Sequence, residues 1–199
     1  MITKENKACE YILDFDRKMK KLFEGENPLR KALMGKYGEL LVADEFKKRG
    51  FSVEVEGNLT SYDLIIEGKK VEIRTSEVKR ERAFPKSIKA WGWKLQTNDR
   101  NRNPKELKYD VIVLVQLFDD WKKYNLYILS REEVESMRIT SFSGYQTVAR
   151  GIYLFENDLE EARKVDRHEM ITEKCEDFNN HPKKYLLKWG RMKDIFKSR

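Results

Sequence analysis

The first fifty residues alternate apolar and charged positions with the period of an α-helix. Apolar residues recur every three or four positions at the start of the chain, which predicts an amphipathic helix over about 4–24. Asn27 and Pro28 then form a start signal, because proline is favoured in the first turn of a helix. This second helix is predicted to run to about Arg49 and to stop at Gly50.

Shorter stretches further along the chain have the two-residue period of β-strands or the unbroken apolar character of a buried strand. The predicted strands are residues 51–56, 62–67, 70–76, 110–118 and 124–129. A capping box at Ser130 and Glu133 predicts a short helix through about Met137. Two more helices are predicted, near 160–164 and over about 182–196, and residues 140–155 are predicted to mix loop and strand.

These elements predict one domain over residues 1–199, because no repeat, low-complexity tract or Gly/Ser linker divides the chain. The predicted class is α/β (α+β), with a central mixed sheet flanked by helices. A helical tail is expected from about 158 to 199.

The predicted hairpin places charged and apolar side chains on opposite faces. With Gly68 and Lys69 as a two-residue turn, glycine first, Asp63 faces Arg74 across the hairpin. Asp63, Glu72 and Arg74 then project to one side. The other side carries the predicted core residues Leu64, Ile66, Val71 and Ile73. Diagonal neighbours on such a face lie about 7–8 Å apart at Cα, so two carboxylates can share one small ion.

A third acid, Glu39, lies on the second predicted helix. Small or apolar residues continue its stripe and also cover the opposite side of the helix: Val42, Ala43, Phe46, Leu33, Tyr37, Leu40 and Leu41. A helix that is apolar on both sides packs on both sides, and a carboxylate buried in it needs a cation, a metal or a hydrogen-bond donor. A plainer interpretation stays open here: Asp63 and Arg74 form a cross-strand ion pair, and Glu39 pairs with a lysine.

A family resemblance lies in residues 35–76, GKYGELLVADEFKKRGFSVEVEGNLTSYDLIIEGKKVEIRTS. This run resembles the PD-(D/E)xK superfamily of restriction-endonuclease-like nucleases, which includes archaeal Holliday-junction resolvases and restriction enzymes. In that pattern a helix glutamate, an aspartate entering one strand and a (D/E)-x-K motif on the next strand assemble one site. By position the matches are Glu39, Asp63, Glu72 and, in place of the motif lysine, Arg74. The resemblance implies a restriction-endonuclease-like sheet.

The same resemblance implies a Mg²⁺-dependent endodeoxyribonuclease, a phosphodiester hydrolase of restriction or of DNA repair and recombination. Asp63 and Glu72 are the expected ligands, with Glu39 bound directly or through water, and Mn²⁺ is expected to substitute. The ion would polarise the scissile phosphate and activate a bound water. Arg74 departs from the pattern, because arginine stays protonated and accepts a proton poorly. It is expected to orient water and neutralise the phosphate, and Lys70, on the same predicted face, is a candidate substitute for the lysine.

Arg74 in place of a lysine keeps a second function open, that of a degenerate nuclease fold that binds duplex or branched DNA without cutting it. A nuclease directed at RNA or tRNA is a third, weaker alternative. A homodimer is compatible with the leading hypothesis, because a two-fold pair conveniently cuts two opposite strands.

A net charge of +7 favours an anionic partner, nucleic acid before an acidic membrane surface. Basic residues after the hairpin are predicted to bind the DNA backbone, although a merely solvated surface explains each of them equally well. They are Lys79, Arg80, Arg82, Lys86, Lys89 and Lys94. Gln96 is a candidate accessory residue of the site, and Trp91 and Trp93 are expected in a core or an interface.

The remaining sequence signals exclude other classes of protein. No apolar run approaches the roughly 20 residues needed to span a membrane, and the first residues lack the apolar region of a secretory signal, which predicts a cytoplasmic protein. Cys9 and Cys175 stand far apart, and neither they nor the two histidines, His168 and His181, have zinc-ligand spacing. A disulfide framework and a structural zinc site are therefore not expected.

Overall fold

The computed structural model of the chain describes residues 4–22, 28–55, 62–78, 90–97, 105–118, 121–136, 148–155 and 182–196. Its elements, in chain order, are α1 (Lys4–Leu22), α2 (Pro28–Lys48), β1 (Val53–Val55), β2 (Leu64–Ile66), β3 (Lys69–Glu77), β4 (Ala90–Thr97), β5 (Val111–Leu117), β6 (Tyr124–Ser130), α3 (Arg131–Ser136), β7 (Val148–Phe155), α7 (Pro182–Tyr185) and α8 (Trp189–Phe196). The predicted α+β class is confirmed.

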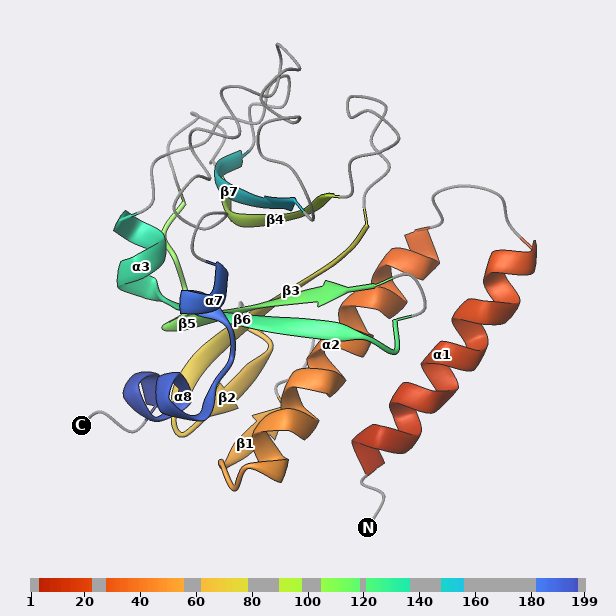
Figure 1. Cartoon of the computed structure of the whole chain (residues 1–199), viewed down its shortest axis with the longest axis horizontal. Coiled ribbons are helices and arrows are strands. Elements are labelled where there is room, and N and C mark those ends of the chain that lie inside the picture. Colours follow the sequence, from red (N-terminus) through yellow and green to blue (C-terminus); the bar gives the residue numbers. More distant parts are fainter. Residues whose placement is uncertain are drawn as a thin grey trace.

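The central sheet is mixed, as predicted, and has the strand order β1-β2-β3-β5-β6. β3 and β5 run parallel, whereas the other neighbours are antiparallel. All residues of β5 are buried, as its continuous β-branched sequence predicts. In Figure 1, α1 and α2 lie side by side along one side of this sheet, and the pair β4 and β7 lies on another.

Two apolar clusters pack on the two faces of β5. Val111, Val113 and Val115 join a cluster with residues of α2 and α8. Ile112 and Leu114 join the other, which includes both tryptophans of β4. β5 is buried on both faces and pairs with β3, which carries three of the predicted site residues, Lys70, Glu72 and Arg74.

The strand β4 was not predicted, although its period-two signal is present in the sequence. Trp91, Trp93 and Leu95 are buried and alternate with Gly92 and Lys94. Both indole N–H groups donate to carbonyl oxygens of β5, over 2.7 Å to Leu117 and 3.3 Å to Val115. The expectation that the tryptophans belong to a core is confirmed.

The partner of β4 is β7, which is the strand part of the region predicted as loop and strand. The helix predicted near residues 160–164 lies outside the described residues.

The predicted helix over 182–196 is broken into α7 and α8, which corrects the prediction. Leu186 forms a β-bridge with Tyr127, and the Leu187 N–H donates to the Leu126 carbonyl oxygen over 2.7 Å. The break has a physical reason, because β6 is an edge strand whose free backbone groups find partners in this segment.

The hairpin turn also differs from the prediction. Glu67 and Gly68 occupy it, both with positive φ (49° and 76°), and Ile65 pairs with Lys70. Positive φ at both central residues is typical of a type I′ turn, whose twist matches that of the strands. The predicted Asp63–Arg74 pairing is therefore wrong, since the register differs by two residues.

The shift of two residues nevertheless leaves every side chain on its predicted face, because side chains alternate with a period of two. The four residues expected in the core are buried together: Leu64, Ile66, Val71 and Ile73. The Glu67 carboxylate also accepts a hydrogen bond from the Ser52 N–H over 2.8 Å, which ties the turn to the residue before β1.

Within the described part of the chain, Cys9 is a buried core residue, and none of the helices is both long and apolar enough to cross a lipid bilayer.

Candidate active site

The helix α2 approaches β3 closely at one glycine. A Cβ atom added to Gly38 would lie 1.9 Å from the Thr75 Oγ1 atom, so only glycine permits this contact. Tyr37, Leu41 and Val42 are buried around it, as expected for a helix packed on both sides. The close approach brings the next residue, Glu39, towards β3, which carries Glu72 and binds Asp63 through the Ile73 N–H.

Asp63 stands immediately before β2, at the point where the backbone pairing of β2 with β3 begins. Its backbone N–H donates to the Val71 carbonyl oxygen over 2.9 Å. One of its carboxylate oxygens accepts a hydrogen bond from the Ile73 N–H over 2.7 Å, so the side chain takes the role of a backbone carbonyl oxygen. The carboxylate is thereby fixed beside β3.

Glu72 is the most buried of the candidate acids. Its side chain is 9% exposed, and its Oε1 atom lies 2.5 Å from the Arg74 guanidinium, whose side chain is 51% exposed. Burial raises the pKa of Glu72 to about 7, with Arg74 lowering it and Asp63 and Glu39 raising it. Burial is the main cause of this raised pKa, and the two neighbouring acids add to it.

The three acids act on one another electrostatically. Burial raises the pKa of Asp63, and the charge of Glu39 raises it further, whereas the Ile73 N–H, Arg74 and Lys36 lower it. Since Glu39 and Asp63 also raise the pKa of Glu72, the carboxylates of α2, of the β2 entry and of β3 lie near enough to interact electrostatically. Perturbed carboxyl groups of this kind are typical of functional sites.

The donor chemistry of this cluster fits a hard divalent cation, because Mg²⁺ and Mn²⁺ prefer carboxylate oxygen. As the side chains lie, however, no three acidic, histidine or cysteine residues of the described chain stand at metal-ligand spacing. Arg74 holds Glu72, Lys36 holds Glu39 over 2.6 Å, and the Ile73 N–H holds Asp63. A metal ion would therefore have to displace cationic side chains from two of the acids.

The structure does not bring every predicted site residue to the acids. The Lys70 ammonium lies over the Tyr62 ring, 5.5 Å from its centroid. Gln96 lies on β4 in the second sheet and donates to the Lys105 carbonyl oxygen over 2.6 Å. Neither contact supports the accessory role predicted from sequence.

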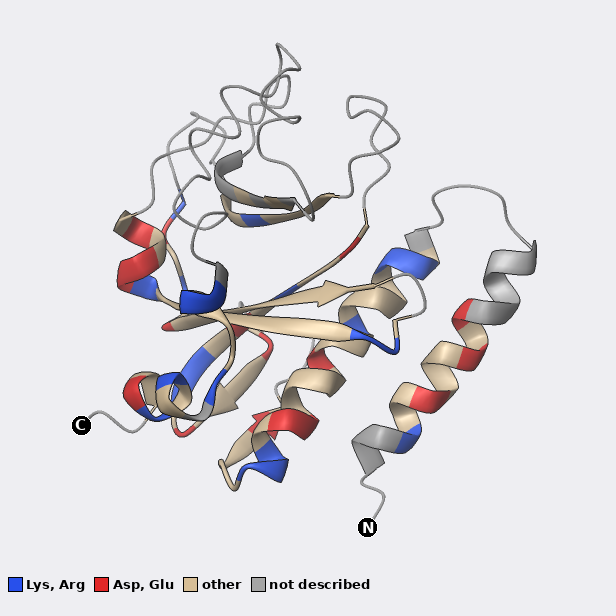
Figure 2. Cartoon of the chain, in the orientation of Figure 1, with Lys and Arg blue, Asp and Glu red and all other residues tan. Residues whose placement is uncertain are grey.

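Of the predicted DNA-binding residues, Lys94 is exposed on β4. The others, Lys79, Arg80, Arg82, Lys86 and Lys89, lie outside the described residues. Figure 2 shows charges of both signs spread along α2, α3 and α8.

Sequence reasoning missed one cation of the cluster, Lys36. It precedes Glu39 by three residues, a spacing that places both side chains on one helix face. That spacing was visible in the sequence. The plainer expectation that Glu39 pairs with a lysine is the contact observed.

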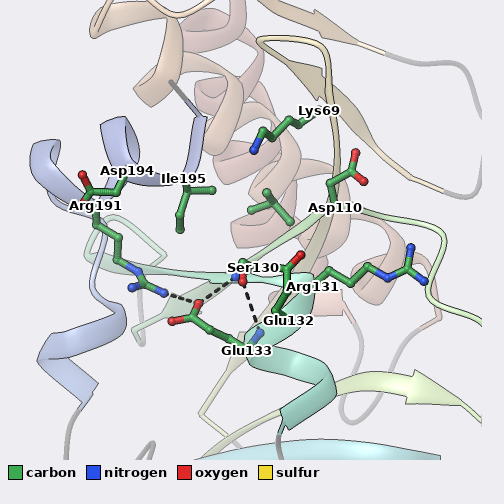
Figure 3. A pocket seen from close by; sticks show the side chains of 10 residues that line it. Lys69, Asp110, Ser130, Arg131, Glu132, Glu133, Arg191, Asp194 and Ile195 are labelled. Carbon is green, nitrogen blue, oxygen red and sulfur yellow. Dashed lines mark hydrogen bonds and ion pairs between the residues drawn. The ribbon is translucent and has the colours of Figure 1, made fainter. Parts of the chain in front are cut away.

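A separate hollow of about 560 Å³ lies between α3, α8 and the start of β5. Figure 3 shows Glu133 between Ser130 and Arg191. Ser130 and Glu133 exchange the two hydrogen bonds of the predicted capping box, and Arg191 binds Glu133 over 2.5 Å and the Ile128 carbonyl oxygen over 2.7 Å. These polar groups fasten α3 and α8 to the sheet, so their role here is structural.

Comparisons with known proteins leave the family of the chain open. No protein-family model matches it, and no curated protein matches it. Among solved structures it is similar to a bacterial homing endonuclease, with 22% identity and a TM-score of 0.39. The match covers 64% of this chain and 76% of the endonuclease. Such a score is too low to establish a shared family or a shared activity.

Proposed function

We propose that this protein is a metal-dependent endonuclease that hydrolyses phosphodiester bonds in DNA, in restriction or in repair and recombination. The observation that carries the proposal is the proximity of Glu39, Asp63 and Glu72, from three different segments. Burial raises the pKa of Asp63 and of Glu72, and the charge of Glu39 raises both further. A fold that crowds three carboxylates next to exposed cations is suited to hold a divalent cation against an anionic substrate.

Asp63 and Glu72 are the proposed ligands of Mg²⁺ or Mn²⁺, with Glu39 as a direct or water-mediated third. Such an ion, when bound, polarises the scissile phosphate and lowers the pKa of a bound water. Hydrolysis adds water across the bond: the water oxygen bonds to phosphorus, the bond to the leaving oxygen breaks, and that oxygen gains a proton from solvent. Arg74 is released from Glu72 in this scheme and neutralises charge on the phosphate.

Cleavage of supercoiled plasmid tests the proposal. We expect the wild-type protein with Mg²⁺ to nick or linearise the plasmid. Asp63→Asn should lower the rate about a hundredfold or more, because it removes a metal-binding charge but keeps an oxygen that accepts the Ile73 N–H. Glu135→Gln is the control, since Glu135 is an exposed residue of α3. Equal rates in the Asp63→Asn and wild-type proteins would reject the assignment.

The engagement of Arg74 with Glu72 favours a second candidate function, a DNA-binding protein that does not cut. In that case Arg74 would permanently occupy the carboxylate that a metal needs. Salt-dependent binding to duplex or branched DNA, with no cleavage in Mg²⁺, Mn²⁺ or Ca²⁺, would favour this candidate.

A further inference from the structure

The acid cluster contains an ammonium group next to the proposed metal ligands. The Lys36 Nζ atom lies 2.6 Å from Glu39 Oε2, and 47% of the Lys36 side chain is exposed. Its charge also lowers the pKa of Asp63, so it lies close to two of the three acids. Lys36 is therefore a cation at the solvent-facing side of the cluster, where a substrate phosphate would arrive.

The other cations near this site have different contacts. Arg74 is bound to Glu72 on its own strand. The Lys70 ammonium lies over the ring of Tyr62. Lys36 differs from Lys70 because it pairs with an acid of the cluster, and it differs from Arg74 because it carries a compact ammonium rather than a planar guanidinium.

We propose that Lys36 is the catalytic lysine of this site, and this inference rests on the proposed function. Its ammonium is a compact charge with three donors, suited to contact a phosphoryl oxygen and the attacking water together. During hydrolysis that oxygen gains negative charge, which a cation already in position stabilises. Lys36 keeps its own proton throughout, and the proton of the attacking water passes to solvent.

Lys36 also competes with a divalent cation for Glu39. Removing its charge makes the cluster more negative and should tighten binding of a metal ion, while it removes stabilisation of the phosphate and should slow cleavage. The two effects have opposite directions. Loss of a merely structural contact would instead weaken metal binding and cleavage together.

The test compares Lys36→Gln with Lys36→Arg and with Lys48→Gln as a matched control. Lys48 lies on the same helix, is 50% exposed and pairs with Asp44 over 2.5 Å, so it repeats the setting of Lys36 away from the three acids. Cleavage of a duplex is measured as kcat and KM in Mg²⁺. Binding of Ca²⁺ without DNA is measured by calorimetry, which is a readout independent of activity.

We expect Lys36→Gln to lower kcat about tenfold or more with little change in KM, and to bind Ca²⁺ about threefold to tenfold more tightly. Lys36→Arg should recover part of kcat and bind Ca²⁺ as the wild type does. Lys48→Gln should change neither quantity. Wild-type kcat and wild-type Ca²⁺ affinity in Lys36→Gln, with Asp63→Asn inactive, would overturn the role of Lys36 and leave the proposed function standing. A wild-type protein that does not cleave would overturn both.

Discussion

At the scale of single residues, Glu72 lowers the stability of the fold in the charged form that the proposed metal site requires. The residue is 7% exposed, and burial raises the pKa of its carboxyl group from an ordinary value of 4.5 to about 7. The folded protein therefore binds a proton at Glu72 more strongly than the unfolded chain does between these two pH values. The contribution of Glu72 to the free energy of unfolding therefore falls as the pH rises from about 4.5 to about 7, and it stays low above pH 7.

Glu72→Gln should relieve this cost. We expect the variant to be more stable than the wild type at pH 8, by up to about 3 kcal/mol, and to be nearly equal to it at pH 4. Urea denaturation at the two pH values measures the difference. The same variant should lose cleavage activity, because a neutral amide replaces the proposed ligand. A variant less stable than the wild type at pH 8 would mean that the Arg74 ion pair outweighs the cost of burial.

At the scale of elements, the site depends on how closely α2 lies against β3. Gly38 touches Thr75, and Glu39 follows directly, so the helix cannot move away without taking an acid with it. Asp63, at the start of the neighbouring strand β2, is held to β3 by the Ile73 N–H. The relative positions of α2, β2 and β3 therefore set the distances between the three carboxylates.

Gly38→Ala should disturb this contact. The added Cβ would meet Thr75 Oγ1 at 1.9 Å, so we expect a loss of about 1–3 kcal/mol in the free energy of unfolding and slower cleavage. Gly35→Ala is the matched control on the same helix, because no atom lies within 4 Å of its added Cβ. It should stabilise α2 by up to about 1 kcal/mol. Denaturant titration of both variants measures the two changes, and equal effects of both would argue against the close contact.

At the scale of the whole molecule, the acid cluster joins segments that are distant in the chain. Glu39 belongs to α2, whereas Asp63 and Glu72 belong to the hairpin, and β5 buries the strand that carries Glu72. The unfolded chain does not hold these residues together. A cation that binds the assembled cluster therefore stabilises the folded protein by mass action.

Ca²⁺ should accordingly raise the Tm of the wild-type protein. At a Ca²⁺ concentration of about 100 times its Kd, the free energy of unfolding should increase by about 2.7 kcal/mol. The rise should be larger at pH 8 than at pH 6, because Glu72 binds a proton at the lower pH and the proton competes with the metal. Thermal unfolding followed by circular dichroism measures it. In Asp63→Asn, the Tm should rise much less when Ca²⁺ is added, relative to the Tm of the same variant without metal. An equal rise in the variant and the wild type would mean that the ion binds elsewhere.

Local pattern alone was enough for several features of this protein. The helices α1 and α2, the buried strand β5, the capping box of α3 and the face occupied by each hairpin residue all follow from short-range periodicity. The predicted faces are correct although the predicted turn is wrong, because a shift of two residues does not change the side to which a side chain points. The same alternation predicts that Asp63 and Glu72 share one face of the hairpin, and the observed register keeps them on one face.

Tertiary structure decided what periodicity does not encode. The break between α7 and α8 depends on the free edge of β6, and the exact turn depends on backbone angles at Glu67 and Gly68. The raised pKa values of Asp63 and Glu72 depend on burial, which follows only when the elements pack together and α2 approaches β3 at Gly38. Periodicity sets the direction of a side chain, but its neighbours across the fold set its charge state and its contacts.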